Sequence, residues 1–407
     1  MRPVGLVVQK FGGTSVADSE RIRAVADHVA RTHRRGHHVV VVVSAMGKST
    51  DDLIRLAGDV SSRSDGREMD VLLTAGERIS MALVAMAISD LGVDAVSFTG
   101  SQAGILTDTH HGRAKILEIR PDRLHETLNA GKVAVVAGFQ GVSTDRDITT
   151  LGRGGSDTTA VALAAALRAD VCEIYTDVSG VYTADPRIVP ATHKLDRISF
   201  EEMLEMAATG GRVLALRSVE FARNHHVPLH VRSSFSWEPG TWVTEEDPSM
   251  EEAIISAVTD DPTQAKVTVL GVPDQPGIAA RLFETLAAGA VNVDMIVQNV
   301  SSHGHADISF TVSESDLAHA LDVARTIGSE LGASEVSADR DIVAVSVVGA
   351  GMKTNPGVAA KMFRVLADAE VNLEMISTST IRITAVIAAD HKERAVQALH
   401  TAFGLDR

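Results

Sequence analysis

Continuous runs of apolar, β-branched residues recur through the first half of the chain, without the alternation that marks a half-exposed strand. They are HVVVVVS (38–44), KVAVVAGF (132–139) and DVCEIYT (170–176). Runs of this kind are typical of strands that are covered on both faces. Helical patterns lie between them, so we expect an α/β domain with a largely parallel central sheet.

Clusters of Gly, Ser and Thr follow the apolar runs. They are KFGGTS (10–15), SAMGKST (44–50), GFQGV (138–142) and TDVSGVYTADPR (176–187). Each cluster would lie at the carboxyl end of a strand, which is where open α/β sheets bind ligands. The sequence therefore predicts one crevice that collects all four segments.

The last third of the chain contains an internal repeat. VTVLGVPDQPGIAARLFETLAAGAVNVDMI (267–296) matches VSVVGAGMKTNPGVAAKMFRVLADAEVNLEMI (345–376), with two residues inserted in the second copy. Each copy predicts a strand, a Pro-Gly turn, an amphipathic helix, a turn with Asn and a strand, and two copies indicate a pair of small α+β domains. The expected boundaries are residues 1–245, 266–337 and 338–407, with 250–265 as a linker or a contributing strand.

Composition narrows the class of protein. The chain has 407 residues, of which 45% are hydrophobic, which suits two to three domains. Its formal net charge is −15 and no stretch gathers Lys, Arg and aromatic residues, so we expect no nucleic-acid partner. No signal peptide precedes Gln9, no apolar run approaches the roughly 18 residues that span a bilayer, and the single Cys172 cannot form an intrachain disulfide. We expect a cytoplasmic protein without a membrane partner.

The segment KFGGTS has the features that a phosphate group needs. Its glycines let backbone N–H groups approach an anion, a helix N-terminus follows, and Lys10 adds a positive charge. The alternative is a tight strand–helix turn with a solvated lysine. The chain has no G-x-x-x-x-G-K-[ST] motif, and GRGGSD (152–157) has only a superficial likeness to G-x-G-x-x-G, which disfavours P-loop and dinucleotide sites.

Two further charged residues stand where a ligand could reach them. Arg153 lies in a glycine loop ahead of a helix that is apolar on every face, and an arginine can hold a carboxylate with two parallel hydrogen bonds. Glu77 follows Gly76 in an otherwise apolar helical run and could hold an ammonium group. The alternatives are a surface arginine and an exposed Glu77–Arg78 stripe.

Three pairs of adjacent histidines raise the question of a metal site. They are His37–His38, His110–His111 and His225–His226. Adjacent side chains point apart on a helix or a strand, so exposed or capping roles are favoured. We assign no metal to protein ligands.

Six motifs in order now identify a resemblance that covers essentially the whole chain. KFGGTS, SAMGKST, LLTAGERIS, GFQG, TTLGRGGSDTTA and YTDVSGVYTADPRIV, followed by the repeat, closely resemble aspartokinases with two ACT domains, especially the actinobacterial type. The resemblance implies an amino-acid-kinase fold that phosphorylates the β-carboxylate of L-aspartate with ATP and Mg²⁺. The product, 4-phospho-L-aspartate, leads to lysine, threonine, methionine and diaminopimelate, and the ACT domains provide feedback regulation.

By its matching motifs, the resemblance also implies residue roles. Asp157 would orient the catalytic Lys10. The transferring phosphate would meet Gly12, Gly13 and Thr14. Aspartate would be held by Ser44, Thr50, Glu77, Arg153 and Ser156. The nucleotide would be contacted by Thr176, Asp177, Tyr182, Asp185, Arg187 and Arg212. Amino-acid effectors would bind near Asp274, Gly277, Asn292, Gln298, Asn355 and Thr380.

Two positions depart from the family pattern. Arg212 in GGRVLAL replaces the usual lysine, which keeps the charge but changes its reach. Thr380 in TSTI replaces an acidic residue. We therefore expect threonine to inhibit, and lysine to inhibit more weakly than in relatives that carry glutamate.

The resemblance further implies a homo-oligomer assembled through the ACT domains, and a separately made regulatory subunit that starts at Met250. Two other classes remain as alternatives. Acetylglutamate or glutamate 5-kinases share the phosphate machinery but are not expected to carry paired ACT units. A non-catalytic ACT sensor would lose Lys10, Arg153 and Asp157, all of which are present here.

Overall fold

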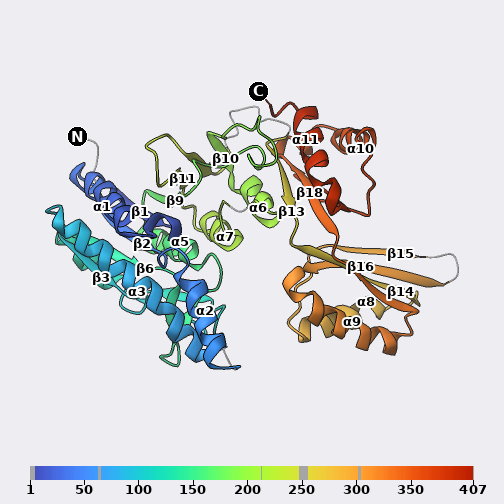
Figure 1. The fold of residues 1–407 in the computed structure, drawn as a ribbon, viewed down its shortest axis with the longest axis horizontal. Helices are drawn as coiled ribbons and strands as arrows, with labels where there is room; N and C mark the ends of the chain where they lie inside the picture. Colours follow the sequence, from blue (N-terminus) through green and yellow to red (C-terminus); the bar gives the residue numbers. More distant parts are fainter. Residues whose placement is uncertain (1–4, 63–65, 212, 247–254, 301–303, 407) are drawn as a thin grey trace. The chain divides into compact units, whose positions relative to one another are not determined.

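The structure is a computed structural model that describes residues 5–62, 66–211, 213–246, 255–300 and 304–406. These residues form two compact units (Figure 1). The first unit draws on 1–181, 194–207 and 212–250, and the second on 182–193, 208–211 and 251–407.

An eight-stranded sheet forms the centre of the first unit. Its order is β10-β12-β11-β9-β1-β2-β6-β3. The strands are β1 Leu6–Phe11, β2 His38–Val43, β3 Ala95–Phe98, β6 Val133–Ala137, β9 Val171–Thr176, β10 Arg197–Ser199, β11 Leu229–Ser233 and β12 Thr241–Thr244. Neighbouring strands are parallel except for the antiparallel pair β11 and β12. The expected largely parallel sheet is confirmed.

Helices cover both faces of this sheet. The helices of the first unit are α1 Ser19–Arg34, α2 Ser49–Val60, α3 Arg67–Asp90, α4 Asp122–Asn129, α5 Gly155–Leu167, α6 Phe200–Ala208 and α7 Leu216–Asn224, with the 3-10 turn η1 Gly13–Val16. Val29 of α1 and Ile88 of α3 share one hydrophobic core with Val41 of β2. Helix α5 packs on β1, β2 and β9, and eleven of its thirteen residues are buried, as its all-round apolar sequence predicts.

The first unit also contains a smaller four-stranded sheet with the order β5-β4-β7-β8. Its strands are β4 Ile105–Thr107, β5 Ile116–Ile119, β7 Gln140–Ser143 and β8 Ile148–Thr150. Strand β8 ends immediately before the glycine loop that contains Arg153.

Among the described residues, α3 alone is long and apolar enough to cross a membrane. The sequence showed no uninterrupted apolar run of that length because Glu77 and Arg78 divide it. Half of the most apolar window of α3 is buried inside the protein, where the helix packs on α1, β3 and β6. These contacts are those of a core helix.

The second unit contains two antiparallel four-stranded sheets, each covered by two helices. The first repeat domain has the sheet order β15-β16-β14-β17 and comprises β14 Gln264–Pro273, α8 Ile278–Ala288, β15 Ile296–Val300, β16 His305–Ser313, η2 Glu314–Asp316, α9 Leu317–Leu331 and β17 Glu335–Asp339. The second repeat domain has the order β13-β18-β20-β19 and comprises β13 Ala257–Asp261, β18 Ile342–Val348, η3 Ala350–Lys353, α10 Val358–Asp368, β19 Met375–Thr378, β20 Arg382–Ala388, η4 Ala389–His391 and α11 Lys392–Ala402.

Strand β13 precedes the first repeat domain in sequence but pairs with β18 of the second. Its antiparallel register joins Ala257 to Val348 and Asp261 to Ala344. One strand of the second repeat sheet therefore comes before the whole first repeat domain in the sequence.

Residues 182–193 follow the β9 loop but pack within the second unit. The backbone N–H of Val258 donates to the carbonyl of Thr183 at 2.8 Å, and the Gln397 side chain donates to the carbonyl of Ile188 at 2.8 Å. The ring of His400 is fully buried, with Nε2 2.9 Å from Thr183 Oγ1 and Nδ1 2.6 Å from Asp406 Oδ1. This histidine joins the segment to α11.

We expect His400→Phe to loosen this segment. Phenylalanine keeps the ring volume but removes the hydrogen bonds of the ring to the Thr183 hydroxyl and to Asp406, a loss of about 1–3 kcal/mol. Hydrogen exchange should accelerate in residues 182–193 and remain unchanged in β16. His319→Ala, which removes an exposed histidine bonded to the Gly289 carbonyl, is the control. Unchanged exchange in 182–193 would show that His400 does not hold the segment.

Candidate active site

A buried ion pair stands at the carboxyl end of β1. Lys10 Nζ lies 2.6 Å from Oδ1 of Asp157, and the two side chains are only 11% and 12% exposed. Asp157 occupies the first turn of α5, where the helix dipole stabilises a carboxylate. The pair fixes the position of the ammonium group.

The loop after β1 passes close to the loop after β2 at Gly13. A Cβ on Gly13 would lie 2.9 Å from the carbonyl oxygen of Ala45, and one on Gly12 would lie 3.4 Å from Lys10 Nζ. The backbone N–H of Gly47 donates to the Gly13 carbonyl at 3.0 Å. The first two predicted loops therefore lie against each other, with bare backbone beside the lysine.

Glu77 reaches this region from α3. Its Oε1 accepts a hydrogen bond of 3.1 Å from the backbone N–H of Ala45, and its buried Oε2 has no partner among the described residues. Burial raises the pKa of Glu77 to about 7, against the lowering effect of backbone hydrogen bonds, including that from Ala45. The position of Gly76 requires glycine, because a Cβ there would lie 2.7 Å from the Cβ of Ala45.

The glycine loop before α5 meets the loop after β6. A Cβ on Gly138 would lie 2.8 Å from Cβ of Ser156, and the Phe139 N–H donates to Thr159 Oγ1 at 3.1 Å. Arg153 is exposed, and its guanidinium has no hydrogen bond or ion pair within the described part of the chain. An arginine in this state is free to bind an anion.

The remaining predicted phosphate, substrate and nucleotide residues lie on several elements, and the Ser44 N–H donates to the Phe11 carbonyl at the end of β1 at 3.1 Å. Thr14 lies in η1 and Thr50 in the first turn of α2, while Ser44 directly follows β2. Thr176 ends β9, and its hydroxyl donates to Asp177 Oδ1 at 3.1 Å. Arg212 lies outside the described residues.

Three predicted nucleotide residues belong to the second unit. They are Tyr182, Asp185 and Arg187. Arg187 Nη2 lies 2.6 Å from Asp185 Oδ2, and Arg187 Nε donates to Asp185 Oδ1 at 3.0 Å. The hydrogen bonds from the Arg187 guanidinium lower the pKa of the Asp185 carboxyl.

The predicted effector residues lie in both repeat domains. Gly277 and Gly357 precede α8 and α10 with φ of 97° and 101°, a conformation that favours glycine. Asn355 donates through Nδ2 to the Gly351 carbonyl at 2.8 Å. The other predicted residues are exposed, namely Asp274, Asn292, Gln298 and Thr380.

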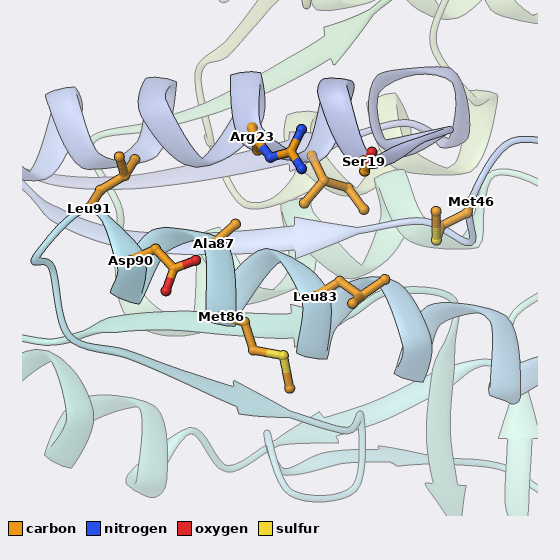
Figure 2. Close-up of a pocket in the computed structure, with 9 residues that line it drawn as sticks. Ser19, Arg23, Met46, Leu83, Met86, Ala87, Asp90 and Leu91 are labelled. Atoms are coloured by element: carbon orange, nitrogen blue, oxygen red, sulfur yellow. The ribbon is translucent and has the colours of Figure 1, made fainter.

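A cavity of about 340 Å³ opens between α1 and α3 (Figure 2). Its walls are largely apolar side chains such as Leu83 and Met86, with Arg23 and Asp90 among the lining residues. None of the predicted site residues lines it. An apolar cavity of this kind does not suit a charged phosphate donor.

No group of three or more His, Cys, Asp and Glu side chains is arranged to hold a metal ion within the described ranges. The histidine pairs differ from one another in their surroundings. His110 is 75% exposed, whereas His111 is only 23% exposed and its Nδ1 lies 2.7 Å from Oδ2 of Asp70. Sequence reasoning overlooked Asp70, whose acidic side chain in a first helical turn gave no sign of its burial.

Family models and curated relatives match this chain over most of its length. The model of the amino acid kinase family matches residues 5–233, and the ACT domain model matches 267–326 and 345–403. The aspartokinase of Mycolicibacterium smegmatis is 57% identical over 99% of this chain and 97% of its own length. The aspartokinase of Corynebacterium glutamicum is 55% identical with the same coverage.

Solved structures are similar as well. Aspartokinase III of E. coli in complex with aspartate and ADP (R-state) matches with a TM-score of 0.85 and 27% identity, covering 98% of this chain and 99% of that one. Aspartate kinase from Synechocystis matches with a TM-score of 0.55 and 47% identity, covering 98% of this chain and 69% of that one. Together with the full-length relatives, these matches show that the chain belongs to the aspartokinase family.

Proposed function

We propose that this aspartate kinase transfers the γ-phosphoryl group of ATP to the β-carboxylate of L-aspartate, giving 4-phospho-L-aspartate and ADP. The observation that carries the proposal is the buried Lys10–Asp157 pair beside the bare backbone of Gly12 and Gly13. The relative solved with aspartate and ADP supports the choice of substrates. The paired ACT domains argue against acetylglutamate and glutamate 5-kinases.

The reaction needs no general base, because the attacking carboxylate is already ionised near neutral pH. Its obstacle is the approach of one anion to another, so positioning and positive charge perform the catalysis. Lys10 stabilises the negative charge on the transferring phosphoryl group, and Asp157 holds Lys10 in place. Backbone N–H groups of the Gly12–Gly13 loop, with Thr14, meet the same group.

Mg²⁺ would enter with the nucleotide. This ion usually binds through substrate phosphates, waters and one or two carboxylates rather than in a cage of protein ligands. That habit fits a site without a three-ligand cluster among the described residues. When bound, Mg²⁺ neutralises phosphate charge.

Aspartate would be held at both of its α-substituents. Arg153 is free to clamp the α-carboxylate, and an ammonium group would give Oε2 of Glu77 the partner that it lacks. The hydroxyl side chains of Ser44, Thr50 and Ser156 complete the proposed contacts.

Five of the proposed nucleotide residues lie at the end of β9 or follow it in the chain. Thr176 and Asp177 belong to the first unit, and Tyr182, Asp185 and Arg187 lie on the segment that packs against α11. Arg212 supplies a further cation. The proposed domains are 1–245, 266–337 and 338–407. Strands β14 and β17 carry the second of them to 264 and 339, and β13 is the proposed contributing strand within 250–265.

Regulation would act through the ACT domains. Aspartokinase III of E. coli has been solved with lysine and aspartate in a T-state. Here threonine would bind near Asp274, Gly277, Asn292 and Gln298, and the site near Asn355 and Thr380 would bind lysine weakly.

The ACT domains would also assemble the oligomer. Edge strands β15 and β19 expose Ile296 and Ile376, by 53% and 42%, as a self-associating surface would. A regulatory subunit would start at Met250, which lies outside the described residues, and the enzyme would act in the cytoplasm.

We expect Lys10→Ala to lower kcat by about 10²–10³-fold while changing the aspartate KM by less than about threefold, because the lysine acts mainly in the transition state. Hydroxamate trapping with ATP and a panel of aspartate, glutamate and N-acetylglutamate measures both the loss and the substrate. A wild-type preference for another acid would refute the function. A raised KM with normal kcat would refute the role of Lys10.

The raised pKa of Glu77 makes aspartate binding pH-dependent. With a pKa of about 7, its ionised fraction grows from about one tenth at pH 6 to about nine tenths at pH 8. Because only the carboxylate holds an ammonium group, kcat/KM for aspartate should rise about ninefold over this range. Glu77→Gln should flatten the profile and raise the aspartate KM. Glu68→Gln, an exposed glutamate on the same helix, should keep the wild-type profile.

Thr380→Glu should strengthen inhibition by lysine and leave inhibition by threonine unchanged. The added carboxylate would attract a cationic effector, by about 0.5–1 kcal/mol at an exposed site. Activity over a lysine-by-threonine grid measures the change. If lysine sensitivity stays the same, Thr380 does not determine it.

A further inference from the structure

Asp70 is a fully buried carboxylate that none of the steps above uses. It lies in the first turn of α3 and accepts hydrogen bonds from Thr150 Oγ1 at 2.5 Å and from the backbone N–H of Gly112 at 3.0 Å. Its Oδ2 lies 2.7 Å from Nδ1 of His111. A buried carboxylate is costly unless it is well paired, and these donors come from the end of strand β8 and from the loop between β4 and β5. With no exposed surface, Asp70 cannot touch a substrate.

Hydrogen bonds connect the partners of Asp70 to the loop that contains Arg153. Thr150 lies three residues before Arg153, and its carbonyl accepts a 2.9 Å hydrogen bond from the N–H of Ala114. The guanidinium of Arg217 donates to the carbonyls of Leu151 and Ala114 at 3.1 and 3.0 Å.

Gly152 packs against one of the partners of Asp70. Its φ is 79°, and a Cβ there would lie 3.1 Å from the carbonyl oxygen of Gly112. The backbone on the N-terminal side of Arg153 is therefore fixed to the residues that Asp70 holds.

Helix α3 carries Asp70 and Glu77 seven residues apart, which is two turns and about 10 Å along the axis. Residues at this spacing lie on one side of a helix. The carboxylate of Asp70 thus ties the helix that presents Glu77 to the loop that presents Arg153.

We propose that Asp70 and His111 are positioning residues for substrate binding. They set the distance between the carboxylate that holds the aspartate ammonium group and the guanidinium that holds its α-carboxylate. The inference rests on the proposed roles of Glu77 and Arg153. A displacement of about 1 Å between two such groups costs a large part of their joint binding energy.

Three variants test the proposal at different strengths. Asp70→Asn removes the charge, Thr150→Val removes one donor while keeping the shape, and His111→Ala truncates a side chain that is partly exposed. Each should raise the aspartate KM, Asp70→Asn by about 5- to 20-fold, and leave the ATP KM within about twofold. The matched control is Asp147→Asn, which removes a partly exposed carboxylate 2.7 Å from Arg67 at the start of α3. It should leave both KM values unchanged.

A purely structural role gives a different result. Loss of folded protein lowers kcat in proportion and leaves the aspartate KM unchanged, and that outcome in the three variants would overturn the proposal. If Asp70→Asn does not fold, His111→Ala decides the question.

If Asp70 positions Arg153, the rise in the aspartate KM of the Asp70 variant must depend on Arg153. We expect the double variant Asp70→Asn/Arg153→Lys to raise the aspartate KM little beyond Arg153→Lys alone, because both changes remove the same contact. Multiplied effects would overturn the positioning role. An unchanged KM in Arg153→Lys would instead refute the proposed aspartate site, so the two failures are distinguishable.

Discussion

The ion pair between Lys10 and Asp157 is the constraint on which the kinase unit depends. Burying two charges is costly, and their attraction offsets the cost only when both groups are held in good geometry. The parallel sheet and α5 provide that geometry, because one side chain leaves the end of β1 and the other the first turn of the helix. Gly12 brings bare backbone to the lysine ammonium group, since a Cβ there would lie 3.4 Å from Nζ.

Glu77 shows the opposite balance. Its carboxylate is buried with one oxygen unpaired, so folding favours its protonated form and raises its pKa. Between the unfolded value near 4.5 and the folded value near 7, rising pH therefore lowers the free energy of unfolding. The ammonium group of the proposed substrate would reverse this balance by stabilising the ionised form. The lower free energy of unfolding above pH 4.5 follows from burying the Glu77 carboxylate with one oxygen unpaired.

Local sequence patterns predicted the layers of the fold and the glycine loops, since continuous apolar runs and Gly clusters reflect burial and turn geometry directly. They could not predict that β13 joins the second repeat sheet, because strand pairing across the intervening first repeat domain leaves no local pattern. Asp70 was missed for a related reason. Its burial depends on donors from Thr150 and Gly112, which lie 80 and 42 residues away in the chain.

The segment 182–193 carries three of the proposed nucleotide residues and packs within the second unit. Tyr182, Asp185 and Arg187 lie on it, and it is held to the second unit by backbone bonds to β13 and by side chains of α11. Packed elements move as bodies rather than deforming continuously, so a shift of α11 carries this segment with it. The chain joins the segment directly to Val181 and Lys194 of the first unit. By linkage, an effector that prefers one arrangement of the second repeat domain would change the proposed nucleotide binding only by the difference between its affinities for the two arrangements.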